Sequence, residues 1–189
     1  MAKGVPTVLA TILTGASLLA AQTVSENQKA VSAHDKLNFF AGTWNLEVRM
    51  KASPFVAKAF YGTEHNEWTP SGTLLISRQE GDAALTAGGL VVMAYDPQEK
   101  SYTYHVVKST GDTEDLKGTL EGNIWTWTND QPTAGSKAAK SRLTITELSP
   151  VSYFLKFETA ADGVDWSTIM EGKANKVLPH AHQDVAFLR

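Results

Sequence analysis

The stretch from Gly42 to Lys51 constrains the fold of this chain more than any other. Its apolar residues are Trp44, Leu46, Val48 and Met50, and each is followed by a polar residue: Asn45, Glu47, Arg49 and Lys51. Side chains of a β-strand point alternately to its two faces, so this pattern is typical of a strand with one face in a core. The stretch therefore predicts the first strand of a sheet that later segments complete.

Nine further segments carry strand signals, at intervals of about 8–12 residues. They cover residues 60–68, 73–79, 89–95, 101–108, 115–120, 123–129, 142–148, 153–159 and 165–174. Turn-forming residues such as Pro97 and Gly122 separate them, and no intervening helical pattern is long enough for a parallel crossover. Neighbouring strands are therefore expected to pair antiparallel. Closure into a barrel of about 8–10 strands removes the free edges, and a two-sheet sandwich is the alternative.

The N-terminus has the features of a secretory signal over residues 1–21. Lys3 precedes an apolar run from Val8 to Ala21, and small residues precede Gln22. The run is short for a bilayer span, which needs roughly 20 apolar residues, although an uncleaved anchor stays open as an alternative. We expect a periplasmic or secreted protein, without stable membrane insertion after cleavage.

A short helix is predicted between the signal and the first strand. Ser25 and Gln28 have the spacing of a capping box, and His34 and Leu37 recur at helical spacing before Gly42. We expect a helix over about 26–40. The predicted organisation is a signal (1–21), an N-terminal segment with this helix (22–41), a β-barrel domain (42–176) and a C-terminal tail (177–189).

Charge and cysteine content exclude several classes of protein. The 17 Lys and Arg residues against 20 Asp and Glu give a net charge of −3, and no basic cluster indicates a nucleic-acid partner. The absence of cysteine excludes disulfides, thiolate metal sites and cysteine nucleophiles. Oligomeric state stays open.

Three motifs together resemble the bacterial DUF1579 family over residues 33–176. They are His34-x-x-Leu37, Ala41-Gly42-Thr43-Trp44, and the segment from Asp162 through Trp166 to Gly172. That family is considered lipocalin-like, so the resemblance implies an all-β, antiparallel up-and-down barrel. It also implies a structural role at the barrel base for Gly42 and Trp44.

The resemblance also bears on haem. Nitrobindins, barrels that share the Gly-x-Trp strand start, hold haem iron through a histidine near the end of the barrel chain. No histidine lies between His105 and His180 in this sequence, so haem is not expected and no cofactor is predicted. His180 and His182 have a spacing that suits metal chelation, but a third ligand is lacking apart from Asp184, and we predict no metal site.

A pocket lined by aromatic residues is the first functional hypothesis. The candidates are Tyr104, Trp125, Trp127, Tyr153 and Trp166, with His105 as a polar anchor. They would hold a small apolar ligand, with loops 51–59 and 130–140 gating the mouth. Ordinary barrel core is the alternative for the aromatics, and a wall position is the alternative for His105.

A barrel enzyme is the second hypothesis. His65 and Glu67 share one face of their strand, and an inward orientation would bury an acid/base pair suited to isomerase, cyclase or lyase chemistry. An outward polar face is the alternative for this pair. The third hypothesis is a filled barrel that serves as a structural or partner-binding module.

Overall fold

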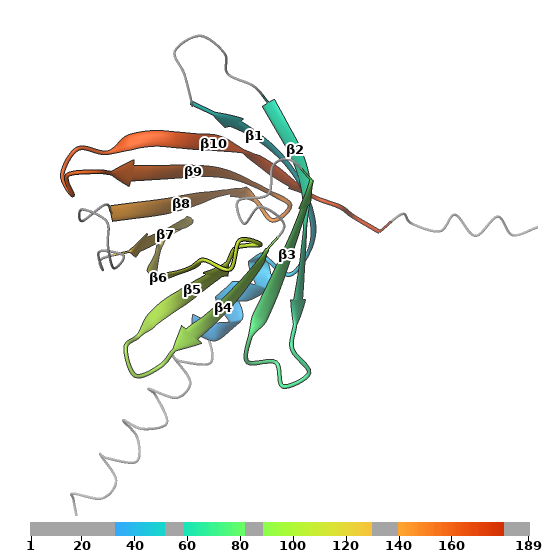
Figure 1. The fold of residues 1–189 in the computed structure, drawn as a ribbon. Helices are drawn as coiled ribbons and strands as arrows, with labels where there is room; N and C mark the ends of the chain where they lie inside the picture. Colours follow the sequence, from blue (N-terminus) through green and yellow to red (C-terminus); the bar gives the residue numbers. More distant parts are fainter. Residues whose placement is uncertain (1–32, 52–58, 82–88, 130–139, 180–189) are drawn as a thin grey trace, which may run out of the picture.

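The computed structural model describes residues 33–51, 59–81, 89–129 and 140–179. Ten antiparallel strands form a closed barrel, in the order β1-β10-β9-β8-β7-β6-β5-β4-β3-β2 (Figure 1). The elements are η1 (Lys36–Phe39), β1 (Gly42–Met50), β2 (Ala59–Trp68), β3 (Leu75–Gly81), β4 (Leu90–Asp96), β5 (Ser101–Val107), β6 (Thr113–Glu121), β7 (Ile124–Asn129), β8 (Lys140–Ser149), β9 (Ser152–Ala160) and β10 (Ser167–Lys176). The predicted antiparallel barrel is confirmed, and the sandwich alternative is wrong.

Alternation along each strand determines which side chains fill the barrel. In β1, Trp44, Leu46 and Val48 are buried and the residues between them are exposed. The strand closes the barrel because it pairs with β2 along one edge and with β10 along the other. Each strand thereby has a partner on both sides, and the predicted apolar face of β1 becomes part of the interior.

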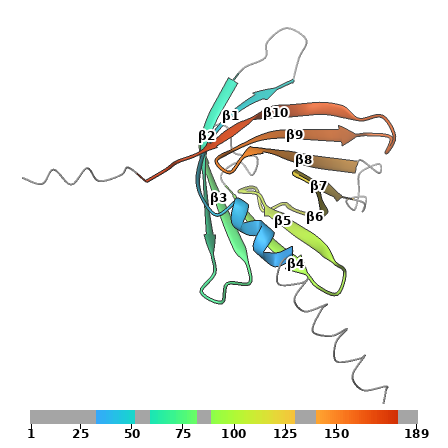
Figure 2. The ribbon, with the colours of Figure 1, turned by 180° about the vertical axis from the view of Figure 1, so that it is seen from behind.

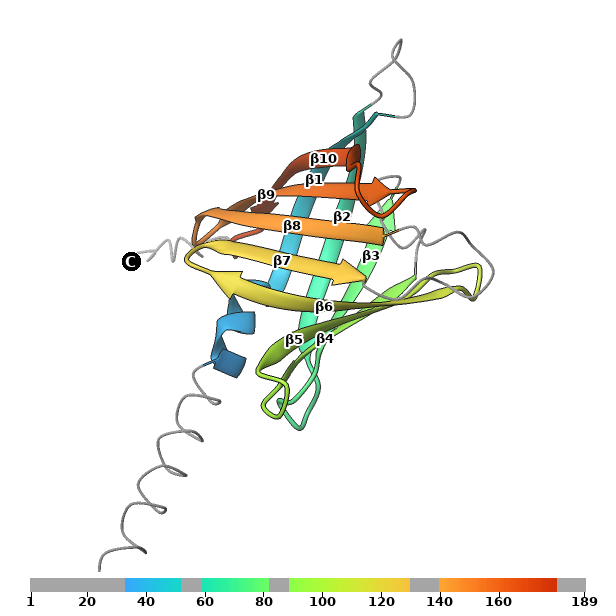
Figure 3. The same cartoon turned by 90° about the vertical axis from the view of Figure 1, so that its left-hand side faces the viewer.

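The two ends of the barrel differ. Because successive strands run in opposite directions, the starts of odd-numbered strands and the ends of even-numbered strands lie at one end, which we call the base. Helix η1 lies at this end (Figures 2 and 3), together with the short connections from β2 to β3, β4 to β5, β6 to β7 and β8 to β9. The opposite end is called the mouth.

Helix η1 is hydrogen-bonded to the base of the barrel through the carbonyl of Phe40, the residue that caps its C-terminus. The Phe40 carbonyl oxygen accepts hydrogen bonds from Trp44 Nε1 at 2.7 Å and from Asn66 Nδ2 at 2.9 Å. Lys176 Nζ lies 5.0 Å from the centre of the Trp44 ring and donates to the Phe39 carbonyl at 3.3 Å. The end of η1 is therefore joined to β1, β2 and β10.

Several predicted segments lie wholly or partly outside the described residues. The signal (1–21), His180 and His182 are among them, and of the helix expected over 26–40 only the helical part from residue 33 onward is described. The predicted gating loops 51–59 and 130–140 connect strand ends at the mouth, but residues 52–58 and 130–139 are not described. Within the described ranges, no helix has the length and apolarity needed to cross a membrane.

Candidate functional site

Large aromatic side chains fill the base half of the barrel. Phe40, Trp44, Trp125, Trp127 and Tyr153 are all fully buried there. Trp125 and Trp127 stack with ring centroids 5.4 Å apart and 7° between their planes. The ring of Tyr153 lies 4.8 Å from that of Trp44, and the ring of Phe40 lies 5.0 Å from that of Trp125. This half of the interior is a packed core.

Trp127 fits into that core because the residue opposite it is a glycine. Gly118 of β6 pairs with Trp127 of β7, and a Cβ atom at Gly118 would lie 2.4 Å from Cδ1 and Nε1 of the indole. Any side chain at position 118 would therefore displace the ring.

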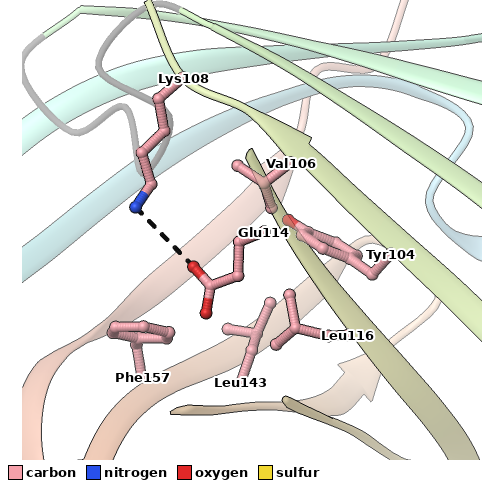
Figure 4. Close-up of a pocket in the computed structure, with 7 residues that line it drawn as sticks. All are labelled: Tyr104, Val106, Lys108, Glu114, Leu116, Leu143 and Phe157. Atoms are coloured by element: carbon pink, nitrogen blue, oxygen red, sulfur yellow. Dashed lines mark ion pairs between the residues drawn. The ribbon is translucent and has the colours of Figure 1, made fainter. Parts of the chain in front are cut away.

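A cavity of about 100 Å³ lies toward the mouth (Figure 4). It is lined by Tyr104, Val106, Lys108, Glu114, Leu116, Leu143 and Phe157. These residues come from β5, β6, β8 and β9 and from the residue that follows β5. Three of these residues are aliphatic (Val106, Leu116 and Leu143), and no indole ring lines the cavity, in contrast to the base half.

Polar groups form the rim of the cavity. Lys108 Nζ lies 3.8 Å from Glu114 Oε2, and the Ser141 hydroxyl donates to Glu114 Oε1 (Figure 4 draws the ion pair). Strands β6 and β7 are antiparallel, and Lys117 lies opposite Thr128, one residue before β7 ends at Asn129. Glu114 is three residues nearer the mouth than Lys117, so it lies beyond the end of β7. Glu114 thus reaches β8 beyond the end of the intervening strand.

A larger depression of about 700 Å³ adjoins the cavity at the mouth. The cavity and the depression share Lys108, Glu114 and Phe157 in their linings. Lys140, Ser141 and Thr159 are among the other lining residues of the depression. These shared residues therefore stand between the apolar interior and the mouth.

Glu64 is the most unusual titratable group of the interior. Its side chain is buried, Oε1 accepts hydrogen bonds from Asn66 Nδ2 at 2.8 Å and Ser77 Oγ at 3.2 Å, and Oε2 accepts one from the Tyr153 hydroxyl at 3.0 Å. Among the described residues no cation forms a salt bridge with it. Burial raises the pKa of Glu64, against the lowering effect of these three hydrogen bonds.

Two carboxyl groups influence the Tyr104 hydroxyl. Burial raises the pKa of this hydroxyl, and the charges of Glu64 and Glu114 raise it further. The hydroxyl therefore stays protonated, and it is the polar group at the inner end of the cavity.

The candidate lining residues divide into three groups. Tyr104 lines the cavity, whereas Trp125, Trp127 and Tyr153 point inward but are packed in the base. The other two candidates lie outside the barrel. The Trp166 ring covers the Arg142 guanidinium at 4.1 Å, and the His105 Nδ1 hydrogen-bonds to the exposed Asp115. Neither Trp166 nor His105 reaches the interior.

His65 and Glu67 both face outward. His65 Nδ1 lies 3.1 Å from the Thr43 hydroxyl, and Glu67 forms an ion pair with Arg78 on the outer face. The alternation of β2 places their neighbours Glu64 and Asn66 inside instead. The buried acid/base pair expected for the inward orientation is therefore not formed, and the outward alternative describes these two residues.

The described residues contain no group of three or more His, Asp or Glu side chains placed to hold a metal ion. His180 and His182 lie outside this part of the chain.

The comparisons with known proteins give a family and several structural neighbours. A family model described as "Protein of unknown function (DUF1579)" matches residues 29–176. None of the curated protein sequences matches the chain. The similar solved structures include a redesigned beta barrel, b11L5F_LGL, with 12% sequence identity, coverage of 75% of this chain and 94% of that chain, and a TM-score of 0.38. They also include a redesigned beta barrel, mFAP1, bound to DFHBI (14% identity, coverage of 74% and 96%, TM-score 0.35) and EF1p2_mFAP2b bound to DFHBI (11% identity, coverage of 77% and 98%, TM-score 0.36).

Proposed function

The chain belongs to the DUF1579 family, whose description assigns no function, and from the site itself we propose that the protein binds a small, largely apolar molecule inside the barrel. The observation that carries this proposal is the cavity of about 100 Å³ between β5, β6, β8 and β9. Ligand sites are typically concave and mostly apolar, with a few polar groups that fix orientation. The cavity has this composition, with Tyr104 inside it and Glu114 at its rim.

The size of the cavity limits what enters it. An apolar cavity of about 150 Å³ in another protein binds benzene, so the part of the ligand buried in this smaller cavity is no larger than one small ring. Any further part of the ligand would extend past Phe157 into the depression at the mouth, where Lys108, Lys140 and Glu114 offer charged groups. We therefore propose a ligand whose largely apolar body lies in the cavity and whose remaining part lies at the more polar mouth.

The test uses fluorobenzene, followed by fluorine NMR, with one blocking variant and one matched control. Val106→Phe adds a ring inside the cavity, and Val107→Phe adds the same ring on the outer face of the same strand. Saturable binding is expected for the wild type and for Val107→Phe. Val106→Phe should weaken binding by about tenfold or more. Absence of binding to the wild type, or equal binding to Val106→Phe, would contradict the proposal and favour a filled barrel.

We also propose export as the setting of this function. The predicted signal at residues 1–21 would carry the barrel to the periplasm or out of the cell. N-terminal sequencing of the protein produced in a bacterial host tests this. A mature chain that begins at Gln22 supports export, and an intact N-terminus in the cytoplasmic fraction contradicts it.

A further inference from the structure

The Tyr104 hydroxyl is a polar group on the surface of the cavity. Tyr104 is 7% exposed and lines the cavity, and no described residue forms a hydrogen bond with its hydroxyl. The other two buried tyrosines do have acceptors: Tyr102 donates to the Ala33 carbonyl at 2.9 Å, and Tyr153 donates to Glu64. The hydroxyl is not one of the fully buried polar atoms that lack a partner, so it is accessible from the cavity and available to bond to a molecule there.

The position of the hydroxyl is fixed by packing. The Tyr104 ring lies 5.3 Å from that of Trp127, in the core of the base half. Tyr104 pairs with Leu116 in the register of β5 and β6, and Figure 4 shows its oxygen directed toward the space between Val106 and Glu114. The ring thus belongs to the packed core, whereas the oxygen faces the cavity.

The surrounding charges determine what this hydroxyl binds. Glu64 and Glu114 lie near enough to influence its ionisation, and both disfavour the phenolate. A neutral phenol can donate one hydrogen bond, and the partner it lacks here is an acceptor. An anionic group at this depth would be repelled by the two carboxylates when they are ionised, so the acceptor is expected on an uncharged molecule.

We propose that the Tyr104 hydroxyl donates a hydrogen bond to an acceptor, such as a carbonyl oxygen, on the innermost end of a neutral ligand. This inference rests on the proposed function and deepens it, because it assigns a specificity-determining residue and a chemical class of ligand. The ligand class is a small neutral carbonyl compound or its equivalent, with a largely apolar body. A water molecule in the cavity would also accept this hydrogen bond, so the experiment separates the two.

The experiment compares acetophenone with α-methylstyrene, which has the same shape but carries a CH₂ group in place of the carbonyl oxygen. Two-dimensional amide NMR titrations give the dissociation constant of each probe. Tyr104→Phe keeps the ring and removes the hydroxyl, so acetophenone loses its donor and α-methylstyrene loses nothing. The ratio of acetophenone affinity to α-methylstyrene affinity is expected to fall about fivefold or more from the wild type to Tyr104→Phe.

Tyr153→Phe is the matched control, because it removes a buried hydroxyl from the same interior that does not line the cavity. It should retain the wild-type ratio of the two affinities. The same ratio in Tyr104→Phe as in the wild type would overturn the inference while leaving the proposed function intact. If neither probe binds the wild type, the proposed function fails and this inference fails with it.

Discussion

The hydroxyl of Tyr153 donates a 3.0 Å hydrogen bond to the carboxylate of Glu64, although the two residues are 89 positions apart in the chain. The bond crosses the interior from β9 to β2, and Asn66 and Ser77 complete the hydrogen bonding of the carboxylate. All three partners are uncharged. Within the described residues, the donors that bind this buried acid are therefore all neutral, and this has consequences for stability.

The first prediction concerns the pH dependence of stability. Because burial raises the pKa of Glu64 above its unfolded value, the stability it contributes is fully present below the unfolded pKa and is lost as pH rises through the folded pKa. Glu64→Gln resembles the protonated form at every pH. The variant should therefore match the wild type at about pH 4 and exceed it by about 1–3 kcal/mol at about pH 8.

Thermal unfolding of the two proteins across this pH range provides the measurement. The difference between them isolates Glu64 from the other carboxylates. The raised pKa of Glu64 would be contradicted if the stability difference between the two proteins did not change with pH, or if the wild type became more stable relative to the variant as pH rises. Either result would show that burial does not dominate the pKa of this group.

The second prediction concerns the contact between Gly118 and Trp127. Gly118→Val places side-chain atoms where the indole now lies, and overpacking of this kind typically destabilises by about 1–3 kcal/mol. Thr119→Val, on the exposed outer face of the same strand, should change stability by less than about 0.5 kcal/mol. Chemical denaturation measures both variants, and tryptophan fluorescence reports displacement of the ring. Equal stabilities would contradict the packing described for the base.

The third prediction concerns closure of the base by Trp44. Trp44→Phe removes the hydrogen bond to the Phe40 carbonyl and leaves space in the core, so a loss of about 2–4 kcal/mol is expected. Trp166→Phe makes the same substitution on the outer surface, where the ring contacts Arg142, and should lose about 1 kcal/mol or less. Calorimetry of both variants tests this. A larger loss in Trp166→Phe would contradict the role given to the base.

Much of the fold could be predicted because strand signals are local. Alternation and turn residues gave ten strands whose positions agree with the structure to within a few residues, and the faces of β1 and β5 follow directly from the pattern. Closure of the sheet into a barrel could also be predicted, since the two edge strands of a long meander need hydrogen-bonding partners. A β-bulge, however, shifts by one residue which side chains face inward, and the alternation pattern does not reveal it.

Trp166 illustrates that limit. In an unbroken strand Trp166, Thr168 and Met170 would share a face, and Met170 is indeed buried in the barrel. The register of β10 against β9 shifts between Thr168 and Met170, so the residues before this bulge face the opposite way. Trp166 precedes β10 and contacts Arg142 on the outer surface.

The cavity was missed for a different reason. Sequence reasoning favoured aromatic residues as pocket lining, but large rings fill space, and in this barrel Trp125 and Trp127 form the packed base. The cavity occurs where aliphatic residues such as Leu116 and Leu143 face one another. The sizes of these side chains become informative only once the strand register shows which of them share the same part of the interior.

The buried carboxyl group of Glu64 could have been predicted from the sequence. Glu64 is a charged residue on the face of β2 that also carries Phe60 and Trp68, so it interrupts an otherwise largely apolar face.

The most direct test of the central claim is the location of a bound probe. Intermolecular NOEs between fluorobenzene and assigned methyl groups would give this location. We expect NOEs to the methyls of Val106, Leu116 and Leu143, which line the cavity, and none to those of Leu37 and Leu75, which are buried elsewhere in the core. NOEs to Leu37 or Leu75, or to outer-face methyls such as those of Val107, with none to the cavity residues, would contradict the claim that the mouth half of the barrel is the binding site.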